Sequence, residues 1–476
     1  MIKVLTELQP LVAGSRTVSP FPLEVHSPYT GEVVGRTFLA TPEQIEDAVA
    51  GAVRSFEVTR RLASHERAAI LNTLARKIEE HGEELSRLIA LEAGKPIKDA
   101  RAEVSRGLII VTAGAEEAKR VPGEVLPLDL AKGAEGRWGI VRRFPIGPVL
   151  GITPFNFPLN LAMHKVVPAI ASGNPIVLKL PSKTPLTMLR AADFILEAGW
   201  PPEALSLFAT APDLYDRLVM DDRFKMISFT GSAAVGWRIK AKAGKKRIVL
   251  ELGGNAGVIV DADAPLERTV KRIVAGGFSF AGQSCISVQR VYVHETIASP
   301  LTEALLAEIG KLKLGDPLDP ETDLGPMIDP QAVERTHAWI QEAVREGARV
   351  LCGGSARGAI FEPTLLTDVK TTAKVCREEV FAPLIVLFPF KDLTEAIAAV
   401  NDSPYGLQAG IFTNNLANAL RVFETLEVGG IILNDIPSWR MDTMPYGGVK
   451  DSGFGREGIR YAIEEMTEMR LLVICP

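Results

Sequence analysis

The stretch that decides the fold is MISFTGSAAVGWRIKAKAGKKRIVLEL, at 226–252. Its first five residues are a short apolar run of the kind that forms a buried strand, and 232–243 follow with the pattern of a helix. A second apolar run begins at 247 and ends beside the carboxylate of Glu251. Strand, helix and strand in this order predict one unit of a parallel sheet whose faces are covered by helices.

The same alternation continues on both sides of this stretch. Upstream, strands are predicted at 149–152, 175–180 and 205–209, and a helix at 185–197. Downstream, helices are predicted at 266–281, 298–310, 330–346 and 393–399, and strands at 289–294 and 384–390. The sequence therefore predicts two doubly wound α/β units in tandem.

The N-terminal region from 41 to 118 is predicted to be helical. Thr41 and the proline after it form an N-cap signal, and apolar residues recur at helical spacing. Gly94 is the expected C-cap of a helix that begins near 70. Two segments remain, 121–143 and 466–475, which resemble strands but are too short for a core of their own. They could pair with each other or with another subunit, or cover an edge of their own unit.

The composition is that of an ordinary globular protein. The 476 residues suggest about three structural units, and the formal net charge is -5 with no long tract of Lys or Arg. This charge offers little attraction to nucleic acids or anionic membranes, so we expect neither as a partner. The charge-free stretch 144–163 is rich in proline, which a membrane-spanning helix would not tolerate. The N-terminus lacks the apolar core of a signal peptide, which favours a cytoplasmic protein.

Cysteine and histidine are too sparse for a disulfide framework or a metal clip. The four cysteines lie far apart, and the six histidines show no ligand spacing. We expect a reducing compartment and no metal.

Three polar residues beside predicted strands or helices are candidates for chemistry. Cys285 in GQSC follows a predicted helix, although most cysteines of this kind are inert buried thiols. Glu251 stands where α/β sheets present ligand-binding groups, and two glycines after it allow close approach; the alternative is a solvated strand end. Asn156 in TPFNFP can donate to an oxyanion, or can simply form a turn beside prolines.

Two glycine motifs compete for a phosphate-binding role. FTGSAAVG at 229–236 ends a strand, turns at Gly231 and offers Ser232 as a cap for the next helix, which suits a pyrophosphate. SGFGREG at 452–458 matches GxGxxG but lies near the C-terminus, outside any βαβ unit. We interpret 229–236 as the better candidate and 452–458 as a flexible loop.

A set of longer motifs occurs in a fixed order: PFNFP, IVLKLPSKTP, FTGSAAVG, LELGG, GQSC, EEVFAP and PYGGVKDSGFGREG. Over essentially its full length the chain resembles the aldehyde dehydrogenase superfamily. Its C-terminal motif is most similar to the branch of lactaldehyde dehydrogenases and non-phosphorylating glyceraldehyde-3-phosphate dehydrogenases. The resemblance implies a Rossmann-type cofactor domain, an α/β catalytic domain and a small β bridging flap.

The resemblance also implies NAD(P)-dependent oxidation of an aldehyde to the carboxylic acid. Cys285 would be the nucleophile that forms a thiohemiacetal and then a thioester, with Asn156 holding the oxyanion. Glu251 would activate the hydrolytic water, and Glu457 matches a second carboxylate that is often proposed as a proton relay. A catalytically silent binding protein on this scaffold and a cysteine-dependent acyl hydrolase are the alternatives.

For the cofactor, the resemblance implies contacts from Thr153, Pro154, Phe155, Lys179, Ser182, Gly231, Ser232, Gly236, Leu252, Gly253, Glu379 and Phe381. Ser182 stands where strict NAD members carry a glutamate, which would repel a ribose 2'-phosphate. With Lys183 beside it, this serine should admit NADP. We therefore predict NADP or dual use, with NAD alone as the competing interpretation.

Three positions bear on the substrate. Ser284 replaces the arginine that precedes the nucleophile in phosphate-substrate members of this branch, so a phosphorylated aldehyde loses a charge-assisted contact. Arg106 and Arg440 can supply positive charge unless they are ordinary surface residues. We expect a small aldehyde, neutral or with one carboxylate, such as lactaldehyde or a short semialdehyde, with glyceraldehyde 3-phosphate as the alternative. No consequence can be derived for Asn255, which replaces the commoner lysine after LELGG.

The resemblance further implies a division into parts. These are a cofactor-binding domain at 1–120 and 145–253, a catalytic domain at 254–445, and bridging segments at 121–144 and 446–476. The last strand would pair across a subunit interface, so we expect a homodimer or homotetramer.

Overall fold

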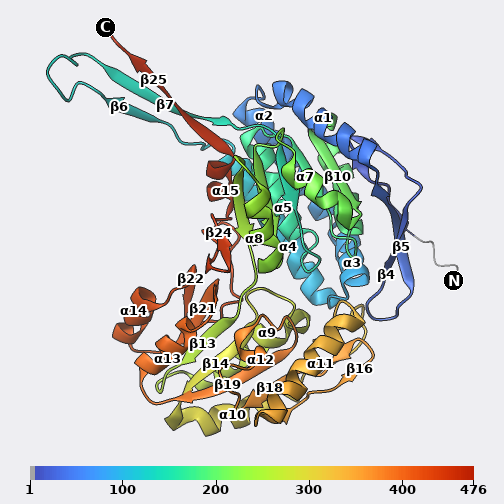
Figure 1. The fold of residues 1–476 in the computed structure, drawn as a ribbon, viewed down its shortest axis with the longest axis vertical. Helices are drawn as coiled ribbons and strands as arrows, with labels where there is room; N and C mark the ends of the chain where they lie inside the picture. Colours follow the sequence, from blue (N-terminus) through green and yellow to red (C-terminus); the bar gives the residue numbers. More distant parts are fainter. Residues whose placement is uncertain (1–5) are drawn as a thin grey trace.

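The computed structural model describes residues 6–476 and consists of two α/β units and a flap. In Figure 1 one unit lies above the other, and the flap projects from the upper unit. The predicted α/β fold class, with a Rossmann-type unit, is confirmed.

The centre of the first sheet consists of parallel strands in the order β10-β9-β8-β11-β12. Their bounds are β8 (Val149–Ile152), β9 (Ile176–Lys179), β10 (Leu205–Thr210), β11 (Met226–Thr230) and β12 (Arg247–Glu251). β8, β10 and β11 are buried along their whole length, as their unbroken apolar runs require. The strand order reverses between β8 and β11, the point where Rossmann-type sheets bind ligands at their carboxyl ends.

Helices cover this sheet. They are α5 (Asn160–Ser172), α6 (Leu186–Glu197), α7 (Tyr215–Met220) and α8 (Ala233–Lys242), together with the N-terminal α1 (Pro42–Thr59), α2 (Ser64–Glu80), α3 (Gly82–Ala93) and α4 (Ile97–Glu117). The single helix expected from about 70 to Gly94 is wrong, because His81 leaves helical geometry between α2 and α3. α5 was not among the predicted helices. The apolar core of this unit packs α2, α4 and α5 around residues such as Leu71, Ile110 and Val167.

Short strands extend the first sheet on both sides. β1 (Thr6–Glu7), β2 (Leu11–Val12), β3 (Ser15–Arg16), β4 (Pro22–His26) and β5 (Val33–Ala40) join it beyond β10, and β24 (Gly453–Phe454) pairs with β12. The flexible loop predicted at 452–458 is therefore wrong. Its residues form β24 and then the N-cap of α15 (Ile459–Glu465), because Gly453 lies opposite Glu251 in an antiparallel ladder.

The second sheet has the order β15-β18-β19-β14-β13-β21-β22. Its strands are β13 (Ala256–Val260), β14 (Val288–His294), β15 (Arg349–Cys352), β18 (Thr364–Thr367), β19 (Leu384–Phe390), β21 (Gln408–Phe412) and β22 (Gly430–Leu433). Its helices are α9 (Leu266–Phe278), α10 (Glu295–Ile309), α11 (Pro330–Arg345), α12 (Lys374–Arg377), α13 (Leu393–Asn401) and α14 (Leu416–Thr425). Val274, Val291 and Ile385 belong to the core between them. Only β15 is antiparallel to its neighbour among these paired strands.

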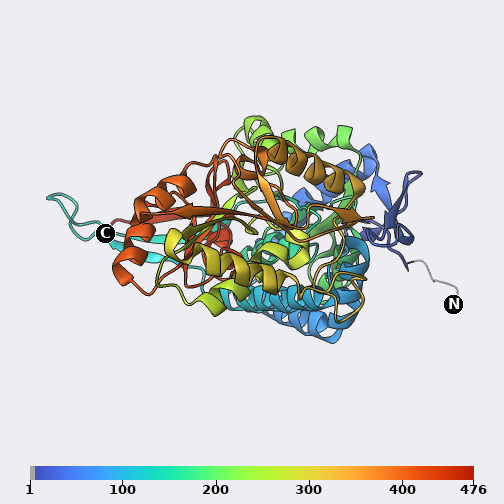
Figure 2. The ribbon, with the colours of Figure 1, turned by 90° about the horizontal axis from the view of Figure 1, so that it is seen from below.

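The two leftover segments pair with each other, which was one of the open alternatives. β7 (Trp138–Pro145) lies between β6 (Glu124–Pro127) and β25 (Thr467–Ile474) in an antiparallel sheet. This flap projects away from the body in both views (Figures 1 and 2). Within 446–476, β24 and α15 pack on the first unit, so only β25 belongs to the flap.

Candidate active site

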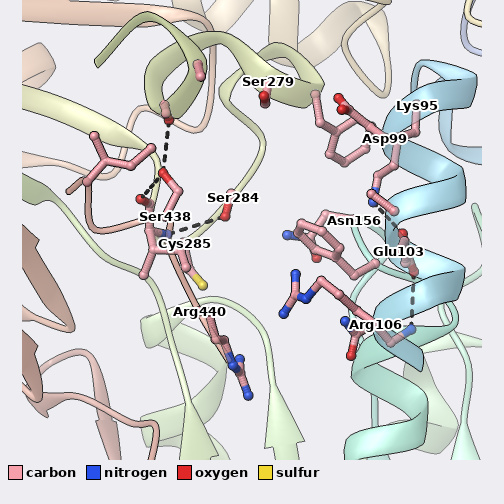
Figure 3. A pocket seen from close by; sticks show the side chains of 18 of the residues that line it. Lys95, Asp99, Glu103, Arg106, Asn156, Ser279, Ser284, Cys285, Ser438 and Arg440 are labelled. Atoms are coloured by element: carbon pink, nitrogen blue, oxygen red, sulfur yellow. Dashed lines mark hydrogen bonds and ion pairs between the residues drawn. The ribbon is translucent and has the colours of Figure 1, made fainter. Parts of the chain in front are cut away.

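Cys285 and Asn156 line one cavity of about 280 Å³ between the two units. The first unit contributes α4 and the loop after β8, and the second contributes the end of α9, the segment before β14 and the loop after β22. Figure 3 shows the Cys285 sulfur, Ser284 and Arg440 on one side of this space, with Asn156 and Arg106 opposite.

A sharp turn after α9 places Cys285. The helix was predicted to reach residue 281, but it ends at Phe278, because Phe280 and Ala281 adopt left-handed backbone angles (φ 48° and 53°). The cysteine is half-buried, and burial raises the pKa of its thiol to about 12. Its Sγ lies 3.2 Å from the hydroxyl of Tyr446. Sequence reasoning missed Tyr446, although it stands in the quoted PYGG motif.

Asn156 is fixed beside the cysteine. Its side chain is 4% exposed, and its Nδ2 donates to the Gln283 carbonyl at 3.0 Å. That bond uses one of the two amide N–H groups, which leaves the other to donate to an oxygen in the cavity. The residue is therefore a buried part of the cavity wall.

Glu251 ends β12 as predicted, but the alternative of a solvated strand end is wrong. The residue is 3% exposed, and neither carboxylate oxygen has a hydrogen-bond partner among the described residues. Burial, followed by the charge of Glu457, raises its pKa well above the ordinary value. A carboxylate with a raised pKa is suited to accept a proton near neutral pH.

Glu457 lies in a different environment. Burial alone would raise its pKa, but the charges around it outweigh that effect and lower the pKa to about 2. Lys165 Nζ lies 3.1 Å from its Oε1, and Arg440 Nη2 lies 3.5 Å from its Oε2. It stays ionised, which does not favour the proposed proton relay and instead suits a counter-ion.

The two glycines after Glu251 permit the close approach that the sequence predicted. A Cβ on Gly254 would lie 2.1 Å from the carbonyl oxygen of Cys285, and one on Gly253 would lie 2.6 Å from Oε2 of Glu379. Glu379 accepts from the Gly254 amide at 3.0 Å, and burial raises its pKa to about 7. The close approach of Gly254 to the Cys285 carbonyl brings the segment after β12 against the segment that carries the cysteine.

Arginines gather on the cavity wall. Arg440 is no surface residue, since its side chain is 5% exposed, and it bonds to His164 at 3.0 Å. Arg106 makes a two-pronged contact with Asp442 at 2.9 and 2.7 Å while it still lines the cavity. Arg272 lines it as well, as do Ser284 and the buried ion pair of Lys95 and Glu103. The wall is thus rich in cations.

A second cavity, of about 440 Å³, lies at the carboxyl ends of β8, β9, β10 and β11. Of the predicted cofactor residues it brings together Thr153, Pro154, Lys179, Ser182, Gly231 and Ser232. The hydroxyl of Tyr215, another lining residue, is buried without a partner among the described residues. Such a cavity at the switch point of a Rossmann-type sheet fits a dinucleotide.

The other predicted cofactor residues lie outside this cavity. Gly236 packs against Leu252, Phe155 contacts Phe381 edge to face at 5.9 Å, and Glu379 joins Gly253 and Gly254.

One expectation about this region is wrong in detail. The Ser232 side chain makes no capping bond to α8, although its residue is the N-cap. Lys183 does not line this cavity, and it forms an ion pair with Asp329.

Two absences hold for residues 6–476. No group of three or more His, Cys, Asp or Glu side chains is placed to hold a metal ion. No helix in this range is both long and apolar enough to cross a bilayer.

Comparison with known proteins identifies the family. The model of the aldehyde dehydrogenase family matches residues 17–472, so the chain belongs to this family. It is similar to 3-sulfolactaldehyde dehydrogenase of Priestia megaterium, with 43% identity over 95% of this chain and 94% of that protein. The chain is an NAD(P)-dependent aldehyde dehydrogenase.

Solved structures of two aldehyde-oxidising enzymes are similar to this chain over nearly its whole length. Aldehyde dehydrogenase 21 from Physcomitrella patens, in complex with its reaction product succinate, superposes with a TM-score of 0.97 at 42% identity, covering 99% of this chain and 98% of that one. Glyceraldehyde-3-phosphate dehydrogenase GapN from Methanocaldococcus jannaschii, complexed with NADP, gives a TM-score of 0.91 at 40% identity, covering 95% of this chain and 98% of that one.

Proposed function

We propose that the protein oxidises a small aldehyde to its carboxylic acid through covalent catalysis at Cys285. The observation that carries this proposal is the shared cavity, in which the thiol, the Asn156 amide and several cations face one another. The cavity of about 280 Å³ suits a small substrate.

The thiolate of Cys285 adds to the aldehyde carbonyl, and the oxygen becomes the oxyanion of a thiohemiacetal. The free N–H of Asn156 donates to that oxyanion, a contact typically worth about 3 kcal/mol in the transition state. Bound NAD or NADP would accept the hydride that the thiohemiacetal loses, which leaves a thioester on Cys285. Glu251 then takes a proton from the water that hydrolyses the thioester, which frees the thiol and the carboxylic acid.

The cofactor would be held by Lys179, Ser182, Gly231 and Ser232 at the first sheet, with Glu379 and Phe381 at the active-site end. We favour NADP or dual use, because the small Ser182 leaves room and no negative charge for a 2'-phosphate. The ion pair of Lys183 removes one expected contact, while the exposed Arg238 lines the same cavity and offers another cation. The GapN neighbour, complexed with NADP, supports this preference.

For the substrate, we favour lactaldehyde or a short semialdehyde with one negative group. Arg106, Arg272 and Arg440 line the cavity, and each also pairs with a carboxylate; N–H groups that these pairs leave over would bind an anionic tail. The P. patens neighbour holds succinate, and the Priestia relative is named for 3-sulfolactaldehyde. Glyceraldehyde 3-phosphate remains the second candidate, because the GapN neighbour is named for it.

We also propose the three-part division given above, with only β25 of 446–476 assigned to the flap, together with a cytoplasmic location and a homodimer or homotetramer. The flap supports assembly, because Met469, Leu471, Leu472 and Val473 on β25 are exposed apolar side chains of a thin sheet.

The test is a panel of small aldehydes, with reduced cofactor followed spectroscopically. Lactaldehyde and 4-oxobutanoate should give higher kcat/KM than propanal and glyceraldehyde 3-phosphate. Cys285→Ala should abolish turnover while cofactor binding persists. Ester hydrolysis without any aldehyde oxidation would instead favour the acyl hydrolase.

A further inference from the structure

We propose that Tyr446 is a catalytic residue whose hydroxyl donates a hydrogen bond to the Cys285 sulfur and stabilises its thiolate. The proposal rests on the role of Cys285 as the nucleophile and assigns the group that supports it. The two atoms lie 3.2 Å apart, although 161 positions separate the residues in the chain. Tyr446 is 3% exposed and packs with Ile286 and Leu407, so its ring is held in place.

The direction of this bond follows from the surroundings of the phenol. Burial, followed by the neighbouring thiol, raises the pKa of Tyr446 well above its ordinary value, so the phenol keeps its proton. A thiolate can only accept. Once the sulfur ionises, the bond therefore becomes a charge-assisted O–H to sulfur contact, which is stronger than the neutral one.

The thiol has few other means of ionising. Burial raises its pKa, and within the described chain no lysine, arginine or histidine is hydrogen-bonded to its sulfur. Cysteine nucleophiles elsewhere gain their thiolate character from such cations or from a helix N-terminus. Here the contacting side chain is a neutral phenol.

A cation acts on the sulfur through that phenol. The Arg440 guanidinium lies 3.6 Å from the centre of the Tyr446 ring. Its position is fixed by His164 at 3.0 Å and by Glu457 at 3.5 Å. A positive charge against the ring strengthens the phenol as a donor, because it stabilises electron density that shifts onto the oxygen. Arg440 is thus a positioning and polarising residue, and Tyr446 carries its effect to the reacting atom.

The experiment measures the thiolate directly, without an aldehyde. Iodoacetamide is added to the cofactor-free enzyme at a series of pH values, and alkylation of the Cys285 peptide is followed by mass spectrometry. The thiolate forms the S–C bond, iodide leaves, and the thiol proton passes to the buffer. Tyr446→Phe keeps the ring under Arg440 and removes only the hydroxyl. It should slow alkylation about tenfold at a given pH below the thiol pKa and raise the apparent pKa.

Two further variants serve as a control and as a test in the opposite direction. Tyr461→Phe removes a hydroxyl on α15, outside the cavity lining, and should alkylate like the parent enzyme. 3-Fluorotyrosine at position 446 has a more acidic hydroxyl and should speed alkylation below the thiol pKa. A Tyr446→Phe enzyme that is folded by circular dichroism yet alkylates at the parental rate would overturn the proposal.

Turnover separates this role from substrate recognition. Tyr446→Phe should lower kcat/KM by a similar factor for lactaldehyde and for propanal, because the lost bond is to sulfur. A loss confined to lactaldehyde, with alkylation unchanged, would mean that the hydroxyl contacts the substrate and would also overturn the proposal. An active Cys285→Ala enzyme would instead refute the proposed function itself.

Discussion

Glu251 and Glu457 are both buried, but Lys165 and Arg440 contact only Glu457. The ionised Glu457 adds to the burial that raises the pKa of Glu251. One carboxylate is therefore a fixed anion, and the other, with its raised pKa, is the one suited to take up a proton.

Glu251→Gln should stop the enzyme at the thioester. We expect a burst of about one reduced cofactor per active site, followed by steady turnover at least ~100-fold slower than in the parent enzyme, because the hydrolytic water has lost its base. Stopped-flow absorbance measures both phases. Glu424→Gln, on the exposed face of α14, is the matched control and should leave both phases unchanged. Absence of the burst would place the role of Glu251 before thioester formation.

The rate of turnover should rise with pH. Cys285 and Glu251 both have raised pKa values, and both must lose a proton to act. We therefore expect the steady-state rate at saturating aldehyde and cofactor to be low in acid and to increase with pH. Initial rates in buffers of constant ionic strength provide the test. A turnover rate that is already independent of pH at pH 6 would contradict the raised pKa values of Cys285 and Glu251.

Cofactor choice should depend on Ser182 far more than on Lys183. Ser182→Glu places a carboxylate beside the ribose and should lower kcat/KM for NADP at least ~10-fold relative to NAD. Lys183→Ala should change either value less than about threefold, because Lys183 does not line the dinucleotide cavity and its pair with Asp329 is exposed, so its loss should perturb the structure little. A parent enzyme with a strong NAD preference would refute the NADP assignment.

Arg106 should discriminate between charged and neutral aldehydes. Arg106→Gln is expected to lower kcat/KM for 4-oxobutanoate by about 10- to 100-fold, the cost of one charge-assisted contact, and to affect butanal little. Arg101→Gln changes the same helix at an exposed site, where the arginine pairs with Glu83, and serves as control. An equal loss for both aldehydes would show that Arg106 acts through Asp442 on the structure of the site.

Assembly should fail when the flap is made polar. Leu472 on β25 is 60% exposed, and Val58 on α1 is 54% exposed. Leu472→Glu should convert the oligomer to a monomer in size-exclusion chromatography with light scattering, because a carboxylate would be buried in the interface. Val58→Glu should leave the mass unchanged. A parent protein that is monomeric would exclude the proposed assembly.

Much of the fold was predictable because its central strands are unbroken apolar runs. β8, β11 and β19 lie where the sequence analysis predicted strands, and β12 ends at Glu251. β13 and β21 were missed, as their short runs rich in glycine and alanine carry a weak strand pattern. The break at His81 was missed because apolar spacing continues across it.

The candidate site was predictable only in part. Cys285, Glu251 and Asn156 stand out through their motifs, and the structure brings the cysteine and the asparagine to one cavity. The contact between Cys285 and Tyr446 and the pairing of Lys183 with Asp329 join residues far apart in the chain. Local pattern contains no information about such pairs.

The loop between β22 and β23 (Val449–Lys450) has a wider consequence. This one segment, 434–448, provides Ser438 and Arg440 to the cavity wall, Asp442 to Arg106, and Tyr446 to the thiol. Neither sheet depends on those side chains for its strand pairing. Replacement of this single segment by that of a related chain would therefore change the substrate preference. The dinucleotide cavity and the nucleophile would stay in place.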